Sequence, residues 1–89
     1  MRSRYLEVTY RKGHAFAAYL YLEGGVGAKS ACTKRLGSEL LVDFAETGEP
    51  IGIEIIAPEL VTARDVNAVL RKLGLAEMSA EHLRPLRAA

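Results

Sequence analysis

The chain begins with hydrophobic and polar residues that alternate with a period of two. Leu6, Val8 and Tyr10 follow this pattern, and the Lys12-Gly13 pair behind them suits a tight turn. The next run is hydrophobic at both alternating sets of positions: Phe16, Ala18, Leu20 and Leu22 on one side, and Ala17, Tyr19 and Tyr21 on the other. Such two-sided hydrophobicity predicts an interior strand over residues 15–22 that is covered on both faces.

The middle of the chain predicts a loop, a polar edge strand and a core hairpin. Residues 23–27 are rich in glycine and predict the loop, and residues 29–36 predict an edge strand protected by lysine. Two hydrophobic runs, 40–44 and 50–56, flank Thr47-Gly48. A two-residue turn there sets Phe44 opposite Ile51, Val42 opposite Ile53 and Leu40 opposite Ile55, all six on one face.

The last third of the chain predicts one amphipathic helix. Thr62 and Asp65 suit the capping of its first turn, and Gly74 suits its end. The apolar stripe has helical spacing and consists of Val66, Val69, Leu70 and Leu73. Ser79 can cap one further turn, with Leu83 packing inward.

These elements predict one α+β domain over residues 1–89. It comprises an antiparallel β-meander of about five strands at 5–57, a helix at 62–74 packed on one face, and a helical turn and tail at 79–87.

Composition and charge narrow the function classes. The 89 residues are 49% hydrophobic and 26% charged, an ordinary globular balance, and the net charge is +1. Residues 1–36 carry seven Lys or Arg against two acids, and residues 37–89 carry five against nine. Copies of such a chain can attract one another, or its charges can neutralise each other within the sheet, and either outcome weakens the case for a dedicated polyanion surface. The single cysteine, the lack of a signal-peptide pattern and the lack of a long apolar run predict a cytoplasmic protein without a membrane partner.

The hairpin at residues 42–56 resembles the prokaryotic family called domain of unknown function 2283. Its pattern V-D-(F/L)-x-x-x-G-x-x-x-G-I-E-I-L is met from Val42 to Ile55, with Ile56 in the last position. Tyr10 and residues 18–22 are similar to an upstream segment of that family, so the resemblance covers about residues 5–57. Arg11 and Ala15-Phe16 replace two acids of the family pattern. The resemblance implies a small bacterial β-meander protein of unassigned activity, with an accessory or antitoxin-like role that involves a second small protein.

Asp43 and Glu54 are the candidate polar site. They lie diagonally on the second face of the predicted hairpin, at a spacing where two carboxylates can share a proton, bind a cation or divide acid and base roles. Two acids without a histidine or a third ligand are more simply explained as the solvent-facing side of an amphipathic hairpin.

Other candidate sites have weaker support from their spacing. His14, His82 and Cys32 do not follow a metal-ligand pattern, and Cys32 is predicted to be a buried thiol. The glycine-rich loop lacks the Lys-Ser/Thr ending of a phosphate-binding loop. Lys29, Lys34 and Arg35 beside Tyr19 and Tyr21 leave open a weak nucleic-acid surface.

The leading hypothesis is a non-enzymatic module that forms a homodimer or higher homo-oligomer, without a cofactor or metal. One helix covers one face of the sheet, so the hydrophobic residues of the other face need a second cover. We expect the interface to contain Ala17, Tyr19, Tyr21, Leu41 and Ile56. The alternatives are a metal or enzyme site at Asp43 and Glu54, and nucleic-acid binding through the basic N-terminal half.

Overall fold

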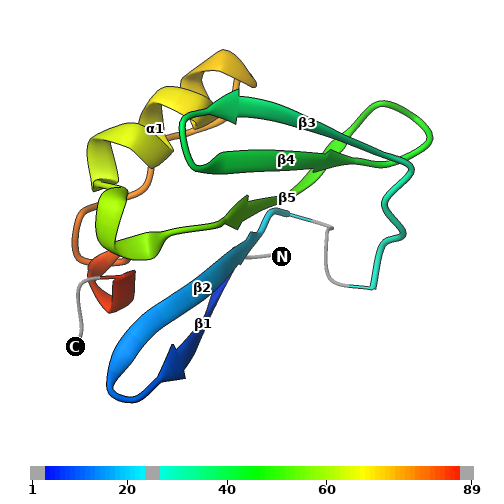
Figure 1. Cartoon of the computed structure of the whole chain (residues 1–89). Helices are drawn as coiled ribbons and strands as arrows, with labels where there is room; N and C mark the ends of the chain where they lie inside the picture. The colour runs from blue at the N-terminus through cyan, green and yellow to red at the C-terminus, as the bar shows by residue number, and fades with distance from the viewer. Residues whose placement is uncertain (1–3, 24–26, 87–89) are drawn as a thin grey trace.

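The computed structural model describes residues 4–23 and 27–86. Its strands are β1 (Tyr5–Arg11), β2 (His14–Tyr21), β3 (Cys32–Gly37), β4 (Leu40–Phe44) and β5 (Pro50–Ile55), and its helix is α1 (Ala63–Lys72) (Figure 1). Short 3-10 turns lie at Pro58–Leu60 and Arg84–Leu86. The predicted α+β class is confirmed. The predicted glycine-rich loop includes residues 24–26, and the predicted tail ends at residue 87; these positions lie outside the described residues.

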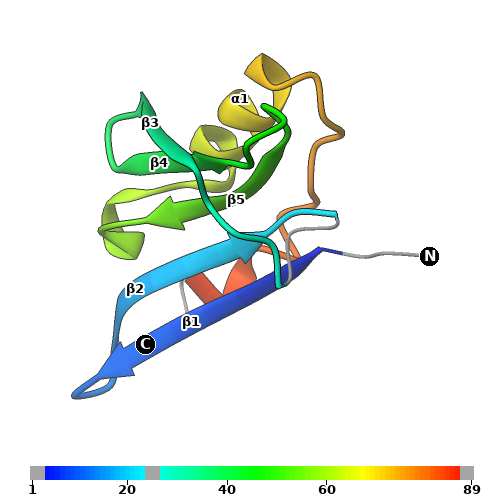
Figure 2. The ribbon, with the colours of Figure 1, turned by 90° about the vertical axis from the view of Figure 1, so that its right-hand side faces the viewer.

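The strand order differs from the predicted meander. The sheet is entirely antiparallel, and its order is β1-β2-β5-β4-β3 (Figure 2). A meander would pair β2 with β3, but β5 takes that place. The physical reason is burial: β2 and β5 are the strands with hydrophobic residues available for the interior, whereas β3 is polar and mostly exposed. The edge position of β3 and the interior position of β2 agree with the sequence.

The β4–β5 hairpin keeps most of its predicted register through two compensating irregularities. Leu40 pairs with Ile55 and Val42 with Ile53, as predicted, but Phe44 pairs with Pro50 instead of Ile51 because the register shifts after Asp43. The loop has three residues, since the N–H of Ala45 donates to the carbonyl of Glu49, and Gly48 adopts a φ of 91°. The extra loop residue and the bulge cancel along the strands.

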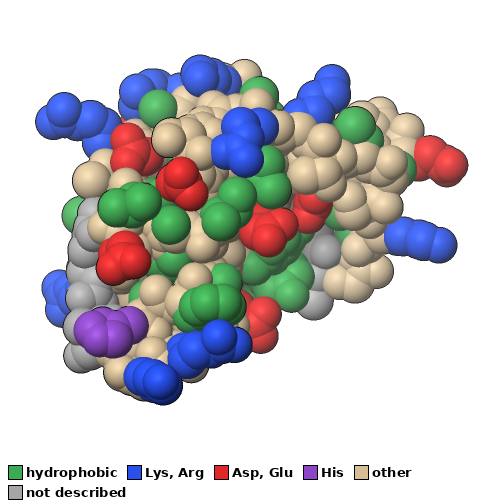
Figure 3. Space-filling view, in the orientation of Figure 1, with side chains coloured by type: hydrophobic (Ala, Val, Ile, Leu, Met, Phe, Trp, Pro, Cys, Tyr) green, Lys and Arg blue, Asp and Glu red, His purple; other side chains and the backbone are tan. Residues whose placement is uncertain are grey.

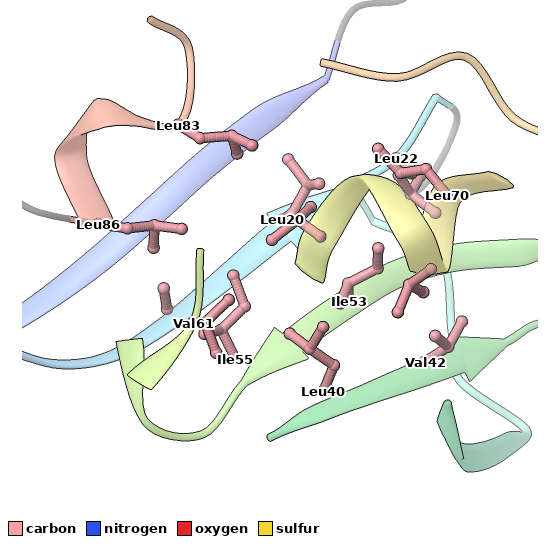
Figure 4. Close-up of a cluster of buried hydrophobic side chains, with 13 residues drawn as sticks. Leu20, Leu22, Leu40, Val42, Ile53, Ile55, Val61, Leu70, Leu83 and Leu86 are labelled. Atoms are coloured by element: carbon pink, nitrogen blue, oxygen red, sulfur yellow. The ribbon is translucent and has the colours of Figure 1, made fainter. Parts of the chain in front are cut away.

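The hydrophobic core lies on one face of the sheet, which we call the core face. The apolar stripe of α1 packs over β4 and β5, and Leu83 and Leu86 of the tail lie beside β1 and β2 (Figure 4). The Thr62–Asp65 capping box is present, and Gly74 follows the helix with a φ of 74°. The tail is thus a second cover for the face that α1 already occupies, not a cover for the opposite face.

Polar contacts from three side chains hold the segment that follows α1 (residues 75–86, which we call the tail) to the rest of the domain. The side chain of Asn67 on α1 donates to the carbonyl of Met78 and accepts from its N–H, at 2.9 and 2.7 Å. Arg4 donates to the carbonyl of Ala76 at 2.6 Å, and the Tyr10 hydroxyl donates to the carbonyl of Pro85 at 3.0 Å. Arg4, the strand β1 and the helix α1 therefore all help to hold the tail on the core face.

Two predicted core positions are exposed instead. Phe16 is 51% exposed near the end of the β1–β2 hairpin, where the guanidinium of Arg11 lies 4.2 Å from its ring centroid. The register shift between Thr9 and Tyr10 and the type I′-like turn at Lys12-Gly13 carry this end of the hairpin beyond the core. Cys32 is exposed as well, because β3 is the outer strand of the sheet.

Candidate functional site

The side of the sheet opposite α1 and the tail, which we call the open face, presents two rows of side chains that cross all five strands. In order from β1 to β3, the first row is Tyr5, Tyr21, Gly52, Asp43 and Thr33, and the second is Glu7, Tyr19, Glu54, Leu41 and Arg35. The pairing registers set these neighbours directly opposite one another. Tyrosine therefore dominates the β1–β2 side of the open face, and polar residues dominate the β3–β4 side.

Tyr19 forms the most specific contact on the open face. Its hydroxyl donates to Oδ2 of Asp43 at 2.7 Å, although β5 separates the two strands. The ring reaches Asp43 by lying over Gly52, where a Cβ atom would overlap the tyrosine hydroxyl, Cζ and Cε2. The hydroxyl of Thr33 on β3 donates to Oδ1 of the same carboxylate. Asp43 on β4 thus links its own strand to both β2 and β3 on this face.

The protonated phenol of Tyr19 is the favoured state. Burial raises the pKa of Tyr19 above its ordinary value of 10.0, and the hydrogen bond to the Asp43 carboxylate and its negative charge raise this pKa further. A phenolate at this position would lose its donated proton and face a carboxylate. Tyr19 therefore acts as a hydrogen-bond donor and does not serve as a base near neutral pH.

The tyrosines form a continuous aromatic strip. The ring centroids of Tyr19 and Tyr21 are 4.7 Å apart with an edge-to-face geometry, and those of Tyr21 and Tyr5 are 5.8 Å apart. Tyr5 is 55% exposed, while Tyr19 and Tyr21 are half-buried. The strip offers rigid aromatic surface toward solvent on the β1–β2 side.

All five predicted interface residues belong to this face or its margin. Ala17, Tyr19, Tyr21 and Leu41 are half-buried and point away from the core face. Ile56 follows β5, pairs through its N–H with the carbonyl of Glu39 at 3.0 Å, and is 39% exposed. The structure therefore brings these residues together on one surface.

Asp43 and Glu54 occupy the predicted diagonal positions, but their surroundings differ. Both oxygens of Asp43 accept hydroxyl hydrogen bonds, whereas Glu54 is exposed between Tyr19 and Leu41. Within residues 4–23 and 27–86, no three His, Cys, Asp or Glu side chains gather as a metal-binding group. The role of Asp43 as the acceptor for Tyr19 was not foreseen, since it depends on the pairing of β2 with β5. The signal in the sequence was Gly52, because a residue without a side chain opposite Asp43 leaves space for the Tyr19 ring to reach the carboxylate.

The other sequence candidates lie apart. Cys32 is on β3 and His14 on β2 at the hairpin turn, while His82 lies in a turn of the tail whose N–H donates to Ser79. His82 lines a groove of about 670 Å³ between β1 and the tail. The charged groups in that groove satisfy each other, because Arg4 pairs with Glu23 at 3.0 Å and donates to Ala76. A backbone hydrogen bond and the Arg4 guanidinium hold the pKa of Glu23 below its ordinary value despite partial burial.

The basic residues proposed for a nucleic-acid surface do not form one continuous patch with the tyrosines of β2. Lys34 lies 5.7 Å from the Phe44 ring centroid, and Arg35 donates to the carbonyl of Ser38. Lys34 pairs with the core residue Val42 and so lies on the core-face side of β3, whereas Arg35 is on the open face, where Leu41 and Glu54 separate it from Tyr19. In the view of Figure 3, acidic, basic and hydrophobic side chains are interspersed, so neither sign of charge fills that side of the molecule.

No helix among the described residues is long and apolar enough to cross a membrane.

No protein-family model, curated protein or solved structure matches the chain. The resemblance to domain of unknown function 2283 stays a prediction that rests on the motif residues. The structure gives several of these residues a physical role: Val42, Ile53 and Ile55 are buried in the core, Gly48 has a positive φ, and Gly52 leaves room for the Tyr19 ring. These roles concern packing and backbone geometry, not catalysis.

Proposed function

We propose that the protein is a non-enzymatic interaction module that self-associates through its open face. The observation that carries this proposal is the position of the two covers. Both α1 and the tail pack on the core face, while the opposite face presents an aromatic strip with Leu41, Ala17 and Ile56 near it. Apolar surface of this kind is stabilised when a second molecule removes it from water.

A second copy is the partner that this face favours. Closed two-fold dimers use the same surface on both subunits, so one self-complementary face is sufficient. Tyrosine provides large contact area with few rotatable bonds, and the Tyr19–Asp43 hydrogen bond already holds one of these rings in place. The domain is small, and burial of further surface stabilises small domains considerably.

Sedimentation equilibrium from about 5 to about 200 μM tests this proposal, because a weak dimer dissociates within that range. We expect the average mass to rise toward twice that of one chain. Ile56→Glu and Tyr5→Glu place a charge at the open face and should shift the protein to monomer. Tyr19 is avoided because its hydroxyl contributes to the fold.

Leu60→Glu is the matched control. Leu60 is 67% exposed in the 3-10 turn after β5 and is not one of the open-face residues. It introduces the same charge and should leave the association unchanged. A wild-type protein that stays monomeric over the whole range, or open-face variants that associate as well as the control, would contradict the proposal.

A further inference from the structure

Charge is distributed unevenly along the second row of the open face. Glu7 lies on the edge strand β1, Arg35 lies on the opposite edge strand β3, and both side chains are exposed. Glu54 lies on β5, the middle strand of the five. The row therefore has an acidic end and a basic end on either side of its centre.

We propose that two copies stack face to face about a two-fold axis that runs along β5, so that Glu7 of each copy meets Arg35 of the other. This inference rests on the proposed self-association. Rotation by 180° about such an axis exchanges the two edges of the sheet, because β5 is the middle strand. It sets β1 against β3 of the second copy and β2 against β4 of the second copy. Each row of one copy then faces the same row of the other copy.

The same rotation matches the remaining residues of both rows. Tyr19 faces Leu41 of the second copy, which joins two hydrophobic side chains. Tyr21 faces Asp43 of the second copy, and an aspartate with additional acceptor capacity suits a phenol donor. A two-fold axis along the second row would instead set Glu7 against Glu7 and Arg35 against Arg35. Charge complementarity therefore favours the axis along β5.

One contact opposes this arrangement and provides a further test of face-to-face stacking, which holds for both axes. The axis passes close to Glu54, so the two Glu54 carboxylates approach each other at the centre of the interface. Like charges at this position weaken association. Neutralising them with Glu54→Gln should therefore tighten the dimer, unlike most substitutions within an interface.

The size of the face predicts a weak dimer. Five strands spaced by about 4.8 Å and five residues per strand at about 3.4 Å give a footprint of roughly 400 Å² per copy. Two such footprints sum to about 800 Å², below the roughly 1,200–2,000 Å² of stable specific interfaces, so the dimer is expected to be weak and transient. A single ion pair at each edge can therefore change the population of dimer measurably.

Charge reversal at the two edges tests the geometry. Glu7→Lys or Arg35→Glu alone should raise the dimer dissociation constant about tenfold, and the double variant should restore it to within about threefold, as expected for a direct charge pair. Glu54→Gln should lower the same constant. Arg64→Glu on α1 is the matched control for Arg35→Glu, because it makes the same charge change at an exposed position away from the open face. Thermal denaturation of each variant checks that the monomer remains folded.

The outcomes separate this inference from the proposed function. If the wild-type protein does not dimerise, the proposed function fails. If it dimerises but the single reversals have no more effect than Arg64→Glu, or the double variant does not recover, then the β5 axis is wrong while self-association stands. A weaker dimer in Glu54→Gln would also contradict this axis.

Discussion

Substitution of Gly52 by alanine should destabilise the domain through Tyr19, although alanine is usually well tolerated in a strand. A Cβ atom at residue 52 would overlap the hydroxyl, Cζ and Cε2 of the tyrosine, so the ring must leave its position over β5. The displacement breaks the hydrogen bond to Asp43. The side chain of residue 52 therefore decides whether β2 and β4 are joined on the open face.

The expected magnitude follows from the two contacts that are lost. A hydrogen bond to a charged group contributes about 1.5–3 kcal/mol, and partial exposure of this pair favours the lower value. Re-exposing roughly 60 Å² of the half-buried ring costs about 1.5 kcal/mol. The free energy of unfolding should fall by about 3 kcal/mol, which corresponds to a decrease in Tm of roughly 12–24 °C for a domain of this size.

The assay is a double-mutant cycle measured by urea denaturation under conditions where the protein is monomeric. In the Tyr19→Ala background the ring is absent, so Gly52→Ala should cost less than about 0.5 kcal/mol. A cost of 3 kcal/mol in both backgrounds would refute the reasoning, because the effect would then come from the strand backbone and not from Tyr19. A cost below about 1 kcal/mol in the wild-type background would refute it as well.

Two further predictions concern Tyr19 and the tail. Because the pKa of Tyr19 is raised in the folded state, its contribution to stability is complete below the ordinary tyrosine pKa of 10.0 and is lost as the pH rises above that value. Ultraviolet titration should show one of the four tyrosines ionising last, and Tyr19→Phe should remove that step; a single shared transition in the wild-type protein would contradict this. Leu86→Ala should lower the free energy of unfolding by about 2 kcal/mol, because Leu86 is buried against the core. Leu60→Ala, at an exposed position, should change it by less than about 0.5 kcal/mol; equal effects would mean that the tail does not contribute to the core.

Local features of the fold were predictable because each depends on neighbouring residues. The Thr62–Asp65 capping box, the apolar stripe of α1 and the glycine that follows it are all read from spacing within a few turns. The pairing of Val42 with Ile53 follows from the requirement that hydrophobic side chains share a face. The three-residue loop and the bulge were missed because their effects on the register cancel.

Long-range features were not predictable in the same way. The hydrophobic pattern identifies interior strands, but it does not say which interior strands pair, and β2 and β5 are separated by two other strands in the sequence. The contact between Tyr19 and Asp43 depends on that pairing, so it could not be found within the hairpin alone. Likewise, the sequence of the tail indicates that Leu83 is buried, but not which face of the sheet it covers.

The residues that resemble a catalytic pair are better explained as the support of an aromatic surface. The two carboxylate oxygens of Asp43 accept hydrogen bonds from the hydroxyls of Tyr19 and Thr33, and Gly52 provides the space in which the Tyr19 ring lies. A ring that is fixed before a partner arrives loses little conformational entropy on binding. The hydrogen bond therefore lowers the cost of association at the centre of the open face. On this reasoning Asp43 affects self-association in two ways, through the position of Tyr19 and through its proposed contact with Tyr21 of the second copy, whereas Glu7 and Arg35 affect it by direct pairing alone.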